Sequence, residues 1–81
     1  MHPINHATQV GASLSARRKA LGLSQTDVAT RLGISQNRLS ELESRPETLT
    51  VAQLLALLNV LGLEMTLAER AGGKSRSSPE W

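Results

Sequence analysis

Apolar residues recur with a helical period across residues 24–43, and this stretch organises our expectations for the rest of the chain. Ser24 and Asp27 stand three positions apart, the spacing of an N-cap residue and its partner in a capping box. Gly33 follows the first apolar face, and glycine adopts the positive φ that ends a helix at little cost. The side chains expected to be buried in this stretch are Val28, Ala29, Leu32, Ile34, Leu39 and Leu42. The pattern predicts two short helices joined by a tight turn.

The second of these helices, capped by Ser35, carries a polar outer face. The side chains left outward there are Gln36, Asn37, Arg38, Ser40 and Glu41. Ala29 is small enough to let the two helices cross closely. The apolar residues, Ala29 and Gly33 match the spacing of DNA-binding helix-turn-helix proteins, whose second helix enters the major groove. The alternative is a helical hairpin that only packs, but such a hairpin needs no exposed cluster of amides.

A further helix is predicted before the motif, over about 8–21, with Val10, Leu14 and Leu21 on one side and Gly22 as its stop. Residues 1–7 are expected to form an N-terminal arm. After the motif, Pro46 prevents simple helix continuation, so 45–49 should form a loop.

Thr50 is expected to cap a last helix over 51–61, ended by Gly62. This helix is apolar nearly all round, and such a helix must be covered on both sides. Residues 63–67 then alternate apolar and polar, which is a strand signal, and a single strand is not stable alone. We therefore predict a homodimer with paired strands and an interface of Leu57, Val60, Leu61, Leu63, Met65 and Leu67. The alternative, a central helix within a monomer, would need more chain.

Composition bounds the possibilities. The chain has 81 residues, 40% of them apolar, enough for one small domain with a modest core. It has no cysteine, which excludes disulfides and cysteine-ligated metals. His2 and His6 lack a third ligand, and Pro3 lies between them, so we expect no metal site and no cofactor. No apolar run could span a membrane and no signal-peptide pattern opens the sequence, so a cytoplasmic, nucleoid-associated location is expected.

The distribution of charge along the chain indicates more than the net charge does. The net charge is only +2, but residues 17–45 hold six basic against three acidic side chains. The positive excess therefore lies largely around the proposed motif, as expected of a nucleic-acid-binding face. On its own, the run Arg17-Arg18-Lys19 would more often be a solvated helix face.

The last residues, 70–81, read as a flexible tail rich in glycine and serine, with Lys74 and Arg76. Trp81 is the only aromatic residue in the sequence. Tryptophan is enriched at binding hot spots, so we expect it to anchor the tail on a partner. The alternative is that Trp81 is incidental.

Together these features resemble a known family. The Leu-Gly-Leu-Ser-Gln of 21–25 and the Leu-Glu of 42–43 are typical of the phage-repressor family (lambda/Cro, xenobiotic-response-element). A strand directly after the fourth helix and a polar tail ending Glu80-Trp81 are similar to the HipB-type antitoxins. The resemblance implies a dimeric repressor that autoregulates its operon through a palindromic operator and restrains a HipA-type serine/threonine kinase toxin.

The resemblance also assigns roles to residues. Base contacts are implied for Gln36, Asn37, Arg38 and Ser40. Phosphate contacts are implied for Gln25 and Arg18. We also expect them of Lys19, Ser24, Ser35 and Arg45, because basic side chains and helix N-termini hold phosphate. An ion pair between Arg18 and Glu43 would tie the first helix to the third. Trp81 would be the toxin-binding residue. The position held by Ser35 is often basic in HipB-type proteins, so the operator sequence should differ.

The predicted fold class is therefore mainly α: a lambda-repressor-like DNA-binding domain of four to five helices over 8–69, with its helix-turn-helix at 24–44. A short C-terminal β-strand would pair across a homodimer. No nucleophile, Ser-His-acid set or phosphate loop suggests an enzyme. Two rival functions stay open at this point: a stand-alone phage-type repressor, and a helical protein-interaction module without DNA or toxin.

Overall fold

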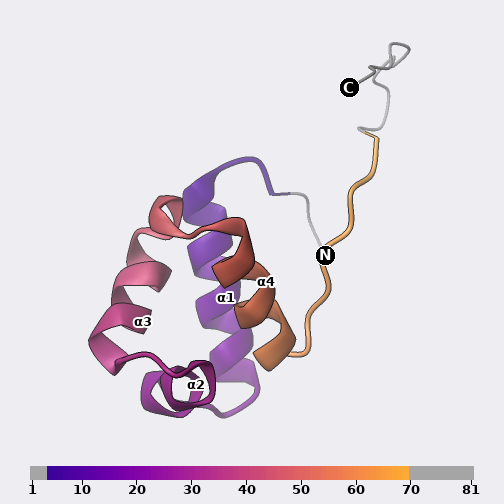
Figure 1. The fold of residues 1–81 in the computed structure, drawn as a ribbon. Helices are drawn as coiled ribbons and strands as arrows, with labels where there is room; N and C mark the ends of the chain where they lie inside the picture. Colours follow the sequence, from indigo (N-terminus) through magenta and orange to yellow (C-terminus); the bar gives the residue numbers. More distant parts are fainter. Residues whose placement is uncertain (1–3, 70–81) are drawn as a thin grey trace.

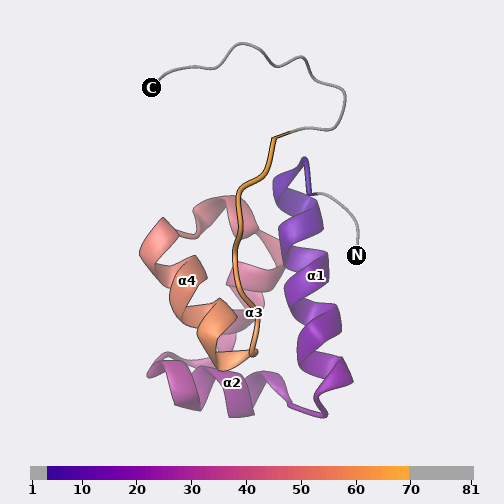
Figure 2. The same cartoon turned by 90° about the vertical axis from the view of Figure 1, so that its right-hand side faces the viewer.

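Four α-helices and one 3-10 turn build the part of the chain that this computed structural model describes, residues 4–69 (Figure 1). The elements are α1 (Ala7–Ala20), α2 (Gln25–Leu32), α3 (Gln36–Ser44), η1 (Pro46–Thr48) and α4 (Val51–Val60). Helix α2 lies across one end of α1, α3 and α4 in both views (Figures 1 and 2). Its packing against α3 gives the predicted helix-turn-helix.

The helix boundaries follow the capping residues found in the sequence. The side-chain oxygens of Ser24, Ser35 and Thr50 each accept a hydrogen bond of 3.0 Å from the backbone N–H three residues on. Such caps satisfy backbone donors that the first turn of a helix leaves free. Gly33 closes α2 with a φ of 74°, in the left-handed region that glycine adopts most easily. The predicted starts and stops of α2, α3 and α4 are therefore confirmed to within one residue.

One core holds the helices together. Its buried members come from all four helices and the end of α4: Leu14, Val28, Ala29, Leu39, Leu57 and Leu61. Burial of such aliphatic side chains provides about 1.5–3 kcal/mol each, relative to their exposure to water. The predicted place of Leu21 was wrong, since this residue is 43% exposed. Helix α1 ends at Ala20 and Leu21 is its C-cap, so Leu21 lies at the end of the helix, two turns beyond the buried Leu14.

The structure also corrects the predicted dimer interface. Leu57 and Leu61 are each 1% exposed within a single chain, so a second chain could not reach them. They lie with Leu54 and Leu58 on the face that packs against the core. The exposed large apolar residues of α4 are instead Val51, at 70%, and Leu55, at 44%.

Residues 63–69 have no regular secondary structure in this single chain. Leu63 packs against the core, whereas Met65 is 45% and Leu67 is 94% exposed. The segment runs along α1 and α4 on the side of the molecule away from α3 (Figures 1 and 2). Because strand pairing needs a second chain, the predicted β-strand stays a prediction. The predicted role of residues 70–81 falls outside the described residues.

A close approach between α1 and α3 depends on Gly11, which is buried. A Cβ placed there would collide with the carbonyl oxygen of Glu43 and lie 3.1 Å from the ring of Pro46. We therefore expect Gly11→Ala to lower the free energy of unfolding by about 1–3 kcal/mol, the usual effect of overpacking a core. Urea denaturation measures this. Ala12→Gly, at the exposed neighbouring position, should cost only about 1 kcal/mol through helix propensity, and a Gly11→Ala effect no larger than that would contradict the steric argument.

Among residues 4–69, none of the helices combines the length and apolar character needed to cross a lipid bilayer.

Candidate nucleic-acid interface

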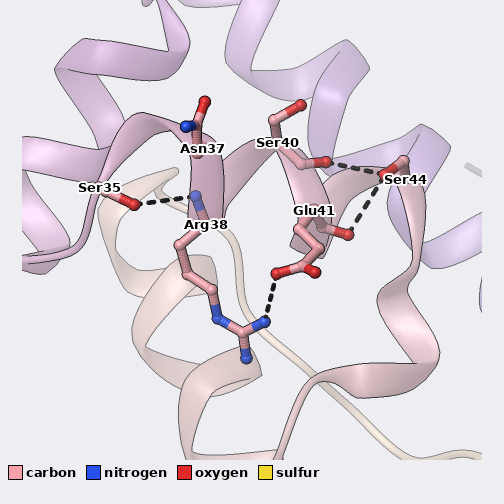
Figure 3. A pocket seen from close by; sticks show the side chains of 6 residues that line it. All are labelled: Ser35, Asn37, Arg38, Ser40, Glu41 and Ser44. Carbon is pink, nitrogen blue, oxygen red and sulfur yellow. Dashed lines mark hydrogen bonds and ion pairs between the residues drawn. The ribbon is translucent and has the colours of Figure 1, made fainter.

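The outer side of α3 carries a shallow, polar pocket. It is lined by Ser35, Asn37, Arg38, Ser40, Glu41 and Ser44 (Figure 3). Asn37 and Arg38 leave the helix in different directions, as adjacent residues on a helix must (Figure 3). Asn37 and Ser40, three residues apart, share one edge of this surface, and Arg38 and Glu41 share the other. The α3 surface, as we call this set together with Gln36, offers amides, hydroxyls and one guanidinium side by side.

Three of the four predicted base-reading residues are open to a ligand. Gln36 and Asn37 are exposed, and Ser40 is half-buried. The Arg38 side chain is 37% exposed, but its Nη1 donates a hydrogen bond of 2.8 Å to Glu41 Oε1. Such an exposed ion pair on a helix surface is worth only a few tenths of a kcal/mol, about 0.3–0.5, so it would not hold Arg38 back from a base.

Behind the α3 surface lies a buried ion pair. Arg18 Nε and Glu43 Oε2 are 2.8 Å apart, with side chains 9% and 8% exposed. A second guanidinium nitrogen, Nη2, donates to Glu43 Oε1 at 3.1 Å, so the contact is bidentate. Arg18 Nη1 also donates to the carbonyl oxygen of Leu23 at 3.0 Å. The predicted ion pair between α1 and α3 is confirmed.

The same burial corrects another prediction. Arg18 as a residue is only 7% exposed, and its guanidinium is already shared among Glu43, Leu23 and Ser15. A side chain so placed has little left to offer a phosphate. Arg18 therefore acts as a positioning residue that joins α1 to α3.

The three consecutive basic residues have three different environments, so they do not form one solvated face. Arg17 is half-buried, and its Nε donates a 2.9 Å hydrogen bond to the carbonyl oxygen of Leu61, at the C-terminal end of α4. A cation there suits the negative end of the helix dipole. Arg18 is buried. Only Lys19 is exposed, and it remains available for phosphate, as does the exposed Arg45 just after α3.

The N-terminus of α2 is not open to an external anion, because the Asp27 carboxylate already accepts a hydrogen bond there. The backbone N–H of Ser24 donates to Asp27 Oδ2 at 2.9 Å, which completes the capping box. The hydrogen bonds from the Ser24 backbone and side chain hold the pKa of the Asp27 carboxyl below its ordinary value. The resulting stabilisation is present above the unfolded pKa of Asp27 and is lost as the pH falls through its lowered folded pKa. The Asp27 carboxylate thus occupies the backbone N–H of Ser24, a residue that was predicted to contact phosphate.

The remaining predicted phosphate residues retain some hydrogen-bonding capacity. Ser35 is exposed, and its oxygen accepts from the backbone N–H of Arg38, which leaves the hydroxyl hydrogen free to donate. Gln25 is half-buried and uses both ends of its amide: Nε2 donates to Glu43 at 3.1 Å, and Oε1 accepts from Gln36 Nε2 at 2.6 Å. The structure therefore brings Gln25 and Gln36 together, whereas the prediction was that Gln25 contacts a phosphate and Gln36 contacts a base.

Two pocket residues were missed by the sequence analysis. Glu41 was noted as outward but assigned no contact with DNA, and Ser44 was not considered. The Ser44 hydroxyl donates to the carbonyl oxygens of Ser40, at 3.0 Å, and Glu41, at 3.3 Å. Their positions, one turn after Asn37 and Ser40, were signal enough to place them on the same surface. No group of three His, Asp or Glu side chains within 4–69 is arranged to hold a metal ion.

Comparison with known proteins gives a consistent result. A family described as helix-turn-helix matches residues 14–68. Antitoxin HipB of Escherichia coli K12 is 27% identical over 73 residues, covering 90% of this chain and 83% of that protein. The protein of the same name in E. coli O6:H1 is 29% identical over 73 residues, covering 90% and 73%.

Solved structures show the same likeness in three dimensions. A HipB-O1-O2 complex superposes with a TM-score of 0.78 at 29% identity, covering 85% of this chain and 100% of that one. A HipA-HipB-O2-O3 complex gives the same TM-score and identity, covering 85% and 97%. The helical arrangement described above is therefore shared with those chains.

Proposed function

Because this chain belongs to the helix-turn-helix family, we propose that it is a sequence-specific DNA-binding repressor that acts as the antitoxin of a HipA-type serine/threonine kinase and represses its own operon. The observation that carries the DNA-binding part is the α3 surface. It gathers exposed amides, hydroxyls and one guanidinium on a helix whose position is fixed by a buried ion pair. These are the groups that read base edges in the major groove.

The antitoxin part of the proposal is supported by the likeness to HipB over nearly the whole chain. The HipA-HipB-O2-O3 complex holds a protein of this fold together with HipA. We propose that this chain likewise binds a HipA-type partner and DNA. We propose a non-enzymatic role, since binding and restraint need no catalytic group.

We further propose a homodimer in which residues 63–67 of two chains pair as antiparallel strands. Val51, Leu55, Met65 and Leu67 then supply apolar surface in place of the buried Leu57 and Leu61. Val60 and Leu63, both half-buried, would complete the interface. Two α3 surfaces related by a two-fold axis would read a palindrome, with half-site centres about 34 Å apart.

The base-reading proposal gives a direct test. Gln36→Ala and Asn37→Ala should each reduce binding of the preferred duplex by about 1–3 kcal/mol and relax specificity at one position per half-site. Specificity is measured by selecting duplexes from a random library with the wild-type protein and then titrating single-base variants by fluorescence anisotropy. Arg45→Ala is the matched control, because loss of a phosphate contact should weaken all duplexes alike and reduce the salt dependence. Unchanged sequence preference in the Gln36→Ala and Asn37→Ala proteins would mean that another surface reads the bases.

The toxin-binding proposal is tested at Trp81, which lies outside the described residues. Trp81→Ala in the full chain should weaken binding to the HipA-type partner by about 2 kcal/mol or more, as loss of a hot-spot residue does, while DNA binding stays the same. Lys74 and Arg76 should add only screened attraction. Isothermal titration of the partner with wild-type and variant proteins measures this. Equal affinities would leave Trp81 without the role, and failure of the wild-type chain to bind the partner at all would favour the stand-alone repressor.

A further inference from the structure

One hydrogen bond ties the end of α4 to α1. Arg17 Nε donates to the carbonyl oxygen of Leu61 at 2.9 Å, between residues 44 positions apart in the sequence. Within residues 4–69 it is the only hydrogen bond that joins α4, or the segment after it, to another helix. A hydrogen bond from a charged donor is roughly twice as strong as one between neutral groups. The contact therefore holds the last carbonyl group of α4 toward α1.

The chain reverses direction directly after this contact. Gly62 has a φ of 68°, and the backbone N–H of Leu63 donates to the carbonyl oxygen of Leu58 at 2.8 Å. These are the features of a Schellman turn, which ends a helix at a glycine in the left-handed region. The Arg17 guanidinium lies beside this turn, since a Cβ placed on Gly62 would be 3.4 Å from its Nη2. The direction in which the chain leaves α4 is thus set by α1 as well as by α4.

The segment after the turn is held less closely. Within the described part of the chain, residues 64–69 form no hydrogen bond with any other residue. They run from the turn back toward the N-terminal end of α1 (Figures 1 and 2). In the dimer proposed above, 63–67 pair with the partner strand, so the turn at Gly62 is where the strand pair joins the four helices. A change in the angle of this turn would move the two α3 surfaces relative to each other.

We propose that Arg17 sets the half-site spacing that the dimer accepts, because its bond to Leu61 holds the turn at Gly62 at one angle. The proposal rests on the DNA-binding dimer proposed above and adds to it a residue that selects the geometry of the operator. Arg17 is a positioning residue in this role, since its guanidinium bonds α4 and is not part of the α3 surface.

The geometry of DNA shows how closely the turn must be held. One added base pair moves the second half-site by about 3.4 Å and turns it by roughly 35°, since one helical turn takes 10–10.5 base pairs over about 34–36 Å. A dimer that distinguishes neighbouring spacings must therefore hold its two α3 surfaces to well within that rotation. The bond from Arg17 acts on the carbonyl group directly before Gly62, where rotation about the backbone redirects the whole segment that follows.

Three substitutions in the full chain test the proposal. Arg17→Met removes the donor and keeps most of the length of the side chain. Arg17→Lys retains a charged donor and should restore part of the wild-type behaviour. Lys19→Met is the matched control, because it removes the same charge from the same helix at an exposed position and leaves the bond to Leu61 in place. Far-UV circular dichroism and urea unfolding verify that each variant is folded.

The measurement is the affinity, by fluorescence anisotropy, for palindromes that carry the half-sites selected by the wild-type protein at the preferred spacing and at one base pair more or less. We expect the wild type to prefer one spacing by about tenfold or more, since linked contacts that cannot engage together lose avidity of about 10²–10⁴. Arg17→Met should reduce the preference to about threefold or less, because a dimer with a mobile turn can engage at several spacings. Lys19→Met should weaken binding at every spacing by one factor.

A second readout needs no DNA. The sequence has no cysteine, so Thr30→Cys, at an exposed position of α2, allows one spin label to be attached to each chain. Double electron–electron resonance then measures the distance between the two labels of a dimer. We expect a narrow distribution of distances in the otherwise wild-type protein and a broader one when Arg17→Met is added.

The outcomes separate this proposal from the underlying function. Equal spacing preferences in the wild type and Arg17→Met, or equal widths of the two distance distributions, would overturn it, as would a wild-type dimer that binds its sequence at all spacings alike. If the wild-type protein selects no sequence or sediments as a monomer, the proposed DNA-binding dimer itself fails and this proposal fails with it. The label distances are measured without DNA, so they distinguish a change in dimer geometry from a loss of DNA binding.

Discussion

Replacing Arg18 by methionine is expected to lower the free energy of unfolding by about 3–5 kcal/mol, because it leaves the carboxylate of Glu43 buried without a counter-charge. The Glu43 side chain is only 8% exposed, so water would reach it poorly. The carbonyl oxygen of Leu23 would lose its guanidinium donor as well. Methionine matches the length of the arginine stem, which keeps the loss of packing small. Urea denaturation at a fixed protein concentration gives the value, since dimerisation would make it depend on concentration.

The double variant Arg18→Met with Glu43→Leu separates charge from packing. Removing both charges should restore most of the lost stability, because replacing a whole buried ion pair by apolar groups is often neutral. DNA binding by the double variant should still be weaker or less specific, since Gln25 would lose its acceptor. A single variant as stable as the wild type would show that the ion pair is not the contact that secures α3.

Much of the fold was predictable because capping and turn residues act locally. Ser24, Ser35 and Thr50 bond to the N–H three residues on, and the sequence shows both partners. Gly33 ends α2 by a backbone preference that depends little on the rest of the protein. Such signals need no knowledge of which helices meet, so they were right to within one residue.

The wrong predictions concern which apolar side chains of a helix pack against the core. In α4 the residues at 54, 57, 58 and 61 follow the spacing of one helical face, and this is the face that packs inward. Counting apolar residues around the helix, instead of following this spacing, placed Leu57 and Leu61 in a dimer interface. The information was present in the sequence. For Leu21 it was not, because its exposure follows from the residue at which α1 ends.

The sequence predicted which residues form the candidate site, but not which of their side chains contact one another. The polar face of α3 follows from sequence, since every apolar position is assigned to the core. The link from Gln36 through Gln25 to Glu43 does not, because it depends on how three side chains from two helices meet. Burial of Arg18 also needed the structure, as the run of three basic residues reads like an exposed face.

Leu67→Glu is expected to convert the proposed dimer into a monomer and to weaken binding of a palindromic duplex by about a hundredfold or more. Leu67 is 94% exposed in the single chain, so the substitution should leave the fold of one chain intact. In the proposed dimer its side chain would pack against cross-strand side chains on the apolar face that it shares with Met65, and burying an unpaired carboxylate there would be strongly unfavourable. A monomer would have to bind each half-site separately, and losing such a linkage commonly lowers avidity by factors of about 10²–10⁴.

Thr66→Glu is the matched control, because it adds the same charge one residue away, on the opposite face of an extended segment. It should remain dimeric, and its DNA binding should fall only through the added negative charge. Sedimentation equilibrium at micromolar concentration and anisotropy titrations on one-half-site and two-half-site duplexes measure both effects. Leu67→Glu and Thr66→Glu carry the same added charge, so they should bind the single half-site alike and differ only on the palindrome. A wild-type protein that sediments as a monomer would overturn the proposed dimer. A Leu67→Glu protein that remains dimeric would instead move the dimer contact away from residues 63–67 and toward the other exposed apolar side chains, Val51 and Leu55 of α4.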